Sequence, residues 1–224
     1  MKKLSTITTM AVLLMMAGSL VSCESTSDIE QVHSYIKVEN ASEFGSVVEV
    51  KMMRGDIELS RVNWKGNGFT PVLPKTISPS LLSALIDNHG LPTTLIINSS
   101  TATISNKNAQ TAGIHFLGVD RNDNRVAVFY PVVIDENGNQ ISMRYDRVRF
   151  EYVNSDVTVS GYVEHTYGRY NTTHIFSIEW KKGWNVLWIS DSVLGEKAIS
   201  KWLTIPRNRL KWYGREWMEA GKDI

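Results

Sequence analysis

The sequence predicts a mostly β fold, an antiparallel β-sandwich or flattened barrel with one short connecting helix at about residues 78–89. Three observations support this prediction. Apolar and polar residues alternate with a period of two over much of the chain, turn-forming residues separate the alternating stretches, and one segment has a helical pattern instead. Short strands joined by frequent turns are typical of sandwiches and barrels.

The N-terminus resembles a bacterial lipoprotein signal. Lys2 and Lys3 precede an apolar run that is too short to span a bilayer, which needs about 20 apolar residues. The run leads to Leu20-Val21-Ser22-Cys23, which resembles a lipobox and holds the only cysteine of the 224 residues. We therefore expect residues 1–22 to be a cleaved signal peptide and Cys23 to carry the lipid. An ordinary secretory signal followed by a free thiol is the alternative.

Residues 23–34 are polar and acidic and are expected to form a flexible tether, because they offer few apolar side chains to pack. Residues 35–224 are expected to form a single β-rich domain. The alternative is two small β domains that divide near residues 105–110. The lipid anchor predicts a location at the outer membrane, and the sequence does not decide between the periplasmic and the surface-facing leaflet.

The expected strands have one polar and one apolar face. In one stretch Phe150 and Tyr152 point to the opposite side from Arg149 and Glu151, so both charged residues are expected to face solvent. The same alternation occurs in residues 48–52 and 157–164. Later, Lys181-Lys182-Gly183 is expected to be a tight hairpin turn in which Gly183 has a positive φ.

The segment at residues 78–89 has the features of a helix of about three turns. Ser78 suits the N-cap, Pro79 suits the first helical position and Gly90 suits the residue after the C-cap. Between them lies an apolar stripe, which consists of Leu81, Leu82, Leu85 and Ile86.

No catalytic motif is evident, so the sequence predicts a protein that is not an enzyme and needs no cofactor or metal. Two segments that begin at Asp120 and Asp135 have the D-x-N-x-N spacing of calcium loops but lack the Gly and Glu that complete such loops. We interpret both as Asx turns. His165 and His174 could face each other across a hairpin, and we expect an exposed pair that flanks the turn rather than a metal site.

The aromatic residues supply the candidate ligand site. Six of the seven tryptophans follow residue 179, and such rings can stack on sugars. The regular alternation around Trp180, Trp184 and Trp188 predicts core positions. The context of four other aromatic residues is less regular, and they are the predicted ligand-binding residues: Trp202, Trp212, Tyr213 and Trp217.

Several short segments together resemble a group of uncharacterised Bacteroidetes lipoproteins, and they are residues 36–40, 67–74, 182–186 and 210–213. This resemblance implies a β-rich envelope domain and supplies no catalytic residues. Asp191-Ser192-Val193 also resembles the short O-glycosylation motif of Bacteroidetes periplasmic proteins, which would place a glycan on Ser192.

The partners expected from the sequence are a membrane, through the lipid anchor, and a glycan or another envelope protein. The chain has 24 basic and 23 acidic residues, and this balance argues against a nucleic-acid partner. We expect a non-enzymatic, lipid-anchored binding module of the cell envelope. The alternatives are a structural or assembly subunit of a surface or fimbrial structure and, less favoured, a hydrolase whose two carboxylates meet only in the folded protein.

Overall fold

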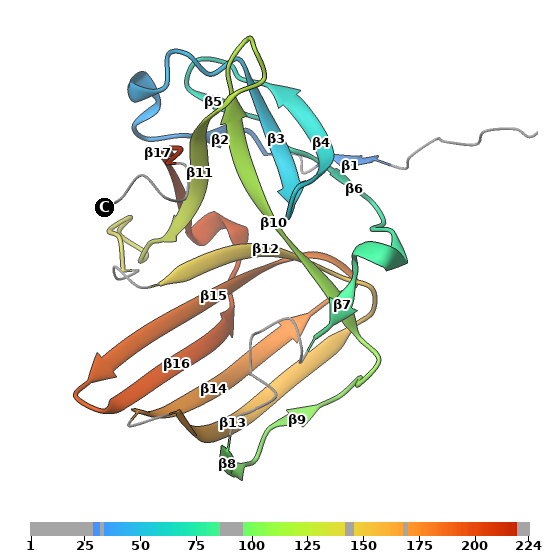
Figure 1. Ribbon diagram of the computed structural model, residues 1–224, viewed down its shortest axis with the longest axis vertical. Coiled ribbons are helices and arrows are strands. Elements are labelled where there is room, and N and C mark those ends of the chain that lie inside the picture. The colour runs from blue at the N-terminus through green and yellow to red at the C-terminus, as the bar shows by residue number, and fades with distance from the viewer. Residues whose placement is uncertain (1–28, 32–33, 86–95, 142–145, 168–169, 219–224) are drawn as a thin grey trace, which may run out of the picture.

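The computed structural model describes residues 29–31, 34–85, 96–141, 146–167 and 170–218 (Figure 1). The described strands are β1 (Ile29–Gln31), β2 (Ile36–Lys37), β3 (Glu49–Arg54), β4 (Ile57–Asn63), β5 (Gly68–Phe69), β6 (Val72–Pro74), β7 (Ser83–Ala84), β8 (Ile96–Ser100), β9 (Thr103–Ile104), β10 (Gln110–Val119), β11 (Arg125–Val133), β12 (Arg147–Val153), β13 (Val157–Tyr167), β14 (Tyr170–Trp180), β15 (Gly183–Leu194), β16 (Lys197–Thr204) and β17 (Leu210–Glu216). The described helices are three 3-10 turns, namely η1 (Ala41–Glu43), η2 (Pro79–Leu81) and η4 (Arg207–Arg209).

The predicted fold class is confirmed, because the chain is mostly β and its sheets resemble a sandwich. The sheets are not closed, so the fold is not a barrel. The main sheet runs in the order β17-β11-β10-β12-β15-β16-β14-β13-β8, with β3, β4, β7 and β9 attached beside this path. Two small two-stranded sheets, β1-β6 and β2-β5, complete the described strands.

Strand β10 connects the two halves of the molecule (Figure 1). The second half of β10 pairs with β11 through Phe116–Val119, and its first half pairs with β12 through Thr111–Ile114. Strands β3 and β7 pair with β10 as well, at residues 115–119 and 110–111. Successive residues of a strand direct their backbone groups to alternate edges. Gln110 bonds to Asn154 beside β12, and Asp120 bonds to Asn124 beside β11. Both positions are even-numbered, so β11 and β12 lie on the same edge of β10. The two strands therefore part from β10 at a fork near residues 114–116.

Two hydrophobic clusters fill the core. The first lies between the β3-β10-β11 half and one face of β12 and β15, and includes Phe116 and Trp212. The second lies on the opposite face and includes Leu187 and Trp202. Strand β15 contributes side chains to both clusters. Trp184 and Val186 belong to the first cluster, and Leu187 and Ile189 belong to the second. A strand that is buried on both faces needs apolar residues at both parities, and β15 has them.

The predicted helix at residues 78–89 is wrong for its described part. Only the single 3-10 turn η2 forms, and Leu82 that follows it is already extended, with φ −88° and ψ 145°. Ser83 and Ala84 then pair with β10 as strand β7. The apolar stripe does not lie on one helix face, because Leu82 packs on the first cluster and Leu85 is buried in the second. An extended segment connects these two sites, and residues 86–89 lie outside the described residues.

The predicted turns agree with the structure. Asp120 and Asp135 form two Asx turns with the same bonding pattern, in which Oδ1 accepts the backbone N–H groups of the residues two and four positions later at 2.8–2.9 Å. Hydrogen bonds hold the pKa of both carboxyl groups below its usual value: the side-chain amide of Asn124 has the largest effect on Asp120, and the backbone N–H of Asn139 has the largest effect on Asp135. Gly183 adopts φ +106°, as the predicted hairpin requires.

Candidate functional site

A cleft of about 370 Å³ opens at the fork where β11 and β12 part from β10. Apolar side chains from the three strands form much of its wall. Five polar residues also line it, and they are Arg54 from the end of β3, His115 from β10, Tyr130 from β11, and Arg149 and Glu151 from β12. Clefts that combine apolar walls with a few convergent polar groups are the usual form of ligand sites.

Glu151 is the most unusual residue of the cleft. Sequence alternation predicts that it faces solvent, but its side chain is 2% exposed, so this prediction is wrong. The reason is its neighbour on β10: Glu151 pairs with Gly113, and a Cβ atom at Gly113 would lie 2.7 Å from Oε1 of Glu151. The carboxyl group therefore lies over a backbone position that has no side chain. In this conformation the carboxyl group occupies space that the Cβ atom of any other residue at position 113 would enter.

Burial without a partner changes the ionisation of Glu151. The described residues supply its carboxyl group with no hydrogen bond and no ion pair. Loss of hydration raises the pKa of Glu151 to about 7, and the positive charges of Arg149 and Arg54 oppose this rise only in part. A carboxyl group that is strongly perturbed by burial and located in a cleft is a candidate for function.

Arg149 and Arg54 are the cationic groups of the cleft. Arg149 is half-buried, and within the described part of the chain its guanidinium has neither a hydrogen bond nor an ion pair. Arg54 donates two long hydrogen bonds, from Nε to the backbone oxygen of Leu81 at 3.4 Å and from Nη2 to Oγ of Ser83 at 3.3 Å. Most of the donor capacity of the two guanidinium groups is thus unused.

His115 adds a neutral group beside these cations. Burial lowers the pKa of His115, and the nearby charge of Arg125 lowers it further, whereas Asp56 raises it. The imidazole is therefore uncharged at neutral pH, and it can accept one hydrogen bond and donate another.

Aromatic side chains extend from the rim of the cleft onto β17. Tyr130 is 38% exposed and pairs across the strands with Tyr213. Tyr213 and Trp217 are half-buried and have the same strand parity. The guanidinium of Arg125 lies 5.4 Å from the ring centre of Trp217. Of the four predicted ligand-binding residues, Tyr213 thus lies on the strand next to the cleft wall, and Trp217 directly follows that strand.

The other two predicted ligand-binding residues are core residues. Trp202 is 3% exposed in the second cluster, where its Nε1 donates a hydrogen bond to Nδ1 of His174 at 3.2 Å. Trp212 is 6% exposed in the first cluster, where its ring meets Phe116 edge-on at 5.0 Å. Trp212 also contributes to the wall of a second cavity of about 370 Å³, beside Tyr35. The irregular spacing around both tryptophans suggested surface positions, but cross-strand packing buries them.

The remaining predicted residues are placed as follows. Trp180 and Trp184 are buried, as expected, and Trp188 is half-buried with its Nε1 bonded to a carboxylate oxygen of Asp146 at 3.0 Å. Ser192 is exposed near the end of β15, and its Oγ is 3.5 Å from the backbone oxygen of Ile199. Cys23 lies outside the described residues.

His165 and His174 do face each other, as the sequence suggested, with stacked rings at 4.9 Å. They are not an exposed pair, however, because His165 is 7% exposed and His174 is half-buried. Burial lowers the pKa of His174 to about 4, and the neighbouring His165 lowers it further. Trp202 occupies Nδ1 of His174, so this pair belongs to the packing of the second cluster.

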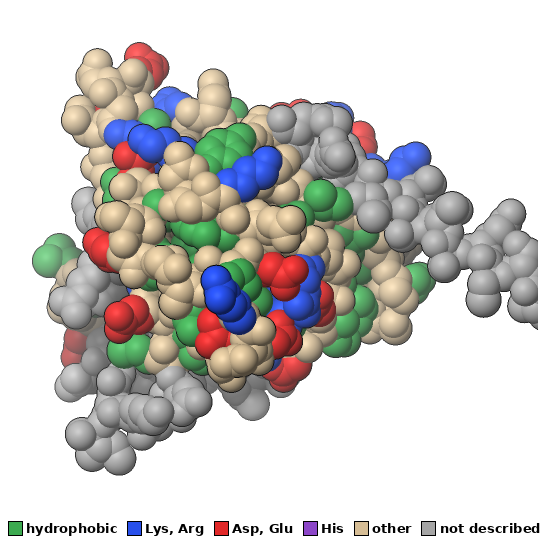
Figure 2. All heavy atoms as spheres, turned by 90° about the horizontal axis from the view of Figure 1, so that it is seen from above, with side chains coloured by type: hydrophobic (Ala, Val, Ile, Leu, Met, Phe, Trp, Pro, Cys, Tyr) green, Lys and Arg blue, Asp and Glu red, His purple; other side chains and the backbone are tan. Residues whose placement is uncertain are grey.

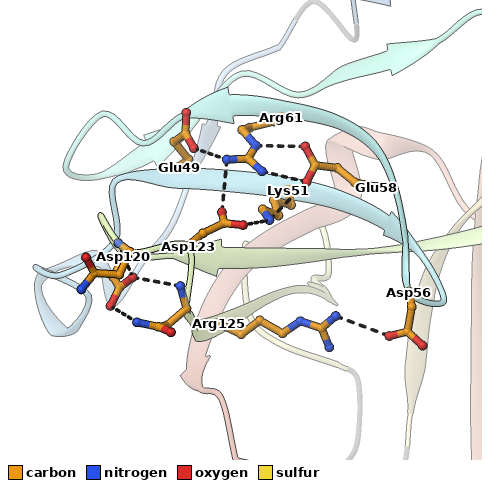
Figure 3. A network of polar contacts seen from close by, with 10 residues as sticks. Glu49, Lys51, Asp56, Glu58, Arg61, Asp120, Asp123 and Arg125 are labelled. Carbon is orange, nitrogen blue, oxygen red and sulfur yellow. Dashed lines mark hydrogen bonds and ion pairs between the residues drawn. The ribbon is translucent and has the colours of Figure 1, made fainter.

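An ion-pair network lies next to the cleft on the same face of the sheet. Lys51 of this network pairs with Leu117 of β10, so the two side chains point to the same face. Leu117 is four residues after Gly113 on β10, and this even spacing places both positions on the face that carries the cleft. Figure 3 shows that the network joins β3, β4 and the β10–β11 turn. Lys51 contacts Asp123 at 2.7 Å and Glu58 at 3.2 Å. Arg61 contacts Glu49 at 2.8 Å, Glu58 at 2.9 Å and Asp123 at 3.1 Å. In Figure 2, acidic and basic side chains lie next to one another on the face that is seen from above.

Searches against protein-family models, curated proteins and solved structures find no match to this chain. Among the described residues, no group of three or more His, Cys, Asp or Glu side chains is placed to hold a metal ion. No helix in the described part of the chain has the length and apolar character to cross a membrane.

Proposed function

We propose that the chain is a non-enzymatic, lipid-anchored protein of the cell envelope that binds a glycan in the cleft at the β10 fork. One observation carries the proposal: the buried carboxyl group of Glu151 and the guanidinium of Arg149 line the same cleft, and no described residue forms a hydrogen bond or an ion pair with either group. Buried polar groups in folded proteins are almost always hydrogen-bonded. Groups that the protein itself does not satisfy are satisfied when a polar ligand binds.

Sugars match this arrangement well. Each sugar hydroxyl both donates and accepts hydrogen bonds, so one ring can donate to Glu151 and accept from Arg149. Tyr130, exposed on the rim, and Tyr213 beside it offer apolar ring surfaces of the kind that pack against sugars. A volume of about 370 Å³ has room for one or two sugar units.

The cleft supports binding better than hydrolysis. Glycoside hydrolases generally use two carboxyl groups about 5–10 Å apart. Among the described residues that line the cleft, Glu151 supplies the single carboxyl group. In this proposal Cys23 carries the lipid, and the residues between Cys23 and strand β1, which pairs with β6, form the tether. The anchored domain then holds its glycan close to the outer membrane. Several weak sites held at one surface can then act together.

A glycan array followed by calorimetry on the anchored protein in detergent micelles tests the proposal. We expect binding by the wild type, and a loss of affinity of about tenfold or more for Tyr130→Ala because it removes a stacking surface. Tyr162→Ala is the matched control, since Tyr162 lies on β13, outside this cleft. If no oligosaccharide binds, or if both variants bind equally well, the proposal is wrong.

A second candidate function, as an assembly subunit, is favoured by one observation. The end of the β15 hairpin exposes two neighbouring apolar side chains, Val193 at 64% and Leu194 at 85%. An exposed apolar tip is typical of a contact with another protein. Light scattering of the wild type and of Leu194→Asp tests this candidate. Concentration-dependent assembly that the substitution abolishes would support it, and a monomer at all concentrations would exclude it.

A further inference from the structure

We infer that the glycan bound in the cleft is acidic, and that Arg149 together with Arg54 binds a carboxylate group of a uronic acid unit. This inference rests on the proposed glycan-binding function and specifies the class of ligand. It derives from the balance of charges in the cleft, where two guanidinium groups lie with a single carboxyl group that pairs with neither of them.

Arg149 is a cation of the cleft that has no anionic partner among the described residues. A guanidinium carries five N–H donors and keeps its charge at every physiological pH. Here the group is half-buried in the cleft, and the described residues give it no acceptor. A cation on the surface is satisfied by water, but a partly buried one gains much more from an anionic partner. The protein supplies no such partner, which leaves this place for a ligand.

Arg54 is the second cation of the cleft. Its two hydrogen bonds, to Leu81 and Ser83, are long at 3.4 and 3.3 Å, and both acceptors are uncharged. These contacts orient the guanidinium without neutralising it. The Nη1 group makes no hydrogen bond with the described residues. Arg54 and Arg149 therefore present positive charge and free donors to the same cavity.

Glu151 does not neutralise this charge. Neither guanidinium lies within the 4.0 Å that defines an ion pair with its carboxyl group. Both arginines nevertheless affect its ionisation through their charge, so both are near it. At neutral pH a large part of the Glu151 population is protonated, and a protonated carboxyl group can itself donate a hydrogen bond to an anion. The cleft keeps a net positive charge in either ionisation state.

The geometry of the donors favours a carboxylate over other anions. Guanidinium and carboxylate are both planar and form two parallel hydrogen bonds with each other. A uronic acid supplies that group on the same ring that carries hydroxyls for Glu151 and an apolar face for Tyr130. Sulfated sugars carry the same negative charge with tetrahedral geometry, and the experiment separates the two.

The test uses isothermal titration calorimetry of the anchored wild-type protein. The probes are oligomers of galacturonate, glucuronate and mannuronate, each with its methyl ester, together with a sulfated oligosaccharide. Methyl esterification removes the charge and keeps the sugar. We expect at least one free acid to bind about tenfold or more tightly than its ester. Arg149→Met should reduce the affinity for that acid to the level of the ester.

Two further variants complete the design. Arg149→Lys keeps the positive charge but loses the planar guanidinium that forms two parallel hydrogen bonds with a carboxylate. The affinity of this variant for the acidic oligomer should therefore fall between those of the wild type and Arg149→Met. Arg61→Met removes an arginine of the ion-pair network on the same face, and it should leave the affinity unchanged. Thermal melting of each variant verifies that it is folded.

The outcomes separate the inference from the function on which it rests. Equal binding of acids and esters, or binding of neutral glycans alone, would overturn the acidic ligand and leave glycan binding intact. Preference for the sulfated probe would overturn the carboxylate. No binding of any carbohydrate, here or on the array, would overturn both proposals.

Discussion

Two neighbouring groups of charges on one face of the sheet differ in their partners and in their exposure. In the ion-pair network of β3 and β4, Lys51 and Arg61 each contact two or more carboxylates. In the cleft a few residues away, Glu151 and Arg149 have no partner among the described residues. Both groups are built from the same residue types on adjacent strands. The charges of the network are paired within the protein, whereas in the proposed function a ligand pairs with the charges of the cleft.

This difference shows how exposure affects charged residues. Apart from Lys51, whose side chain is 12% exposed, the network lies near the surface, where paired charges contribute little to stability because water satisfies them almost as well. In the cleft, burial removes that water, and the consequences appear as a raised pKa and unused donors. Charges that are both partly buried and unpaired therefore indicate a ligand site better than charge density does.

The largest expected effect concerns pH and Glu151. Its pKa rises from 4.5 in the unfolded chain to about 7 in the folded protein, so the folded protein holds a proton that the unfolded chain releases. The associated stability is present below pH 4.5 and is lost as the pH rises through about 7. A pKa change of this size corresponds to about 3 kcal/mol. Urea denaturation of the wild type and Glu151→Gln at several pH values measures it, because the variant lacks this dependence.

The network supplies the opposite case for the same measurement. The hydrogen bond between Glu58 and Arg61 lowers the pKa of Glu58. The stability that this pair gives to the folded protein is therefore present above the unfolded pKa of 4.5 and is lost as the pH falls. Glu58→Gln should therefore destabilise the fold most at high pH, whereas Glu151→Gln, which resembles the protonated carboxyl group, should match the wild type at low pH and be more stable than the wild type above about pH 7. The same sign for both variants would contradict the comparison.

A smaller effect is expected from filling the space beside Glu151. Gly113→Ala places a Cβ atom within 2.7 Å of Oε1 and should destabilise the fold by about 1–3 kcal/mol, because the buried carboxyl group must move. The double variant Gly113→Ala with Glu151→Ala should recover part of this loss in a double-mutant cycle. Gly45→Ala is the control, since no atom lies within 4 Å of its added Cβ. If Gly113→Ala changed neither the stability nor the pKa of Glu151, Glu151 would not lie over β10.

The smallest expected effect compares two arginines. Arg61→Met should destabilise the fold by up to about 1 kcal/mol, since it breaks contacts with three carboxylates at the surface. In about 1 M NaCl this loss should shrink, because salt screens exposed charges. Arg149→Met should cause no loss of stability at either salt concentration. Chemical denaturation measures the free energy of unfolding of both variants at the two salt concentrations. A clear destabilisation by Arg149→Met would reveal that Arg149 has a partner within the protein.

The sequence predicted the fold class but not the site. Alternation of apolar and polar residues reports which residues face the core, and this was sufficient for the strands and for Trp180 and Trp184. The helix prediction at residues 78–89 failed because the stripe at Leu82 and Leu85 serves two clusters. Leucines spaced three or four residues apart lie on one face of a helix. The same spacing also occurs in this extended segment, which runs from the first hydrophobic cluster to the second.

Glu151 could not be found from alternation, which assigns it to the solvent-facing side. Its burial depends on Gly113, which is 38 residues earlier in the chain and becomes its neighbour only when β10 and β12 pair. The predicted surface positions of Trp202 and Trp212 were wrong for the same reason, because neighbours on adjacent strands bury both side chains. The missing information is the register between strands, and a single sequence does not specify it.

The most direct test of the central claim, that the cleft holds an unpaired buried carboxyl group awaiting an acidic ligand, is the NMR titration of Glu151. The ¹³C resonance of its carboxyl carbon is assigned by its absence from Glu151→Gln. The account predicts a midpoint at about pH 7 in the free protein, and a higher midpoint when a uronic acid oligomer is bound, because a second negative charge disfavours ionisation. A midpoint near 4.5, the value of an unperturbed glutamate, with no response to the ligand would contradict it.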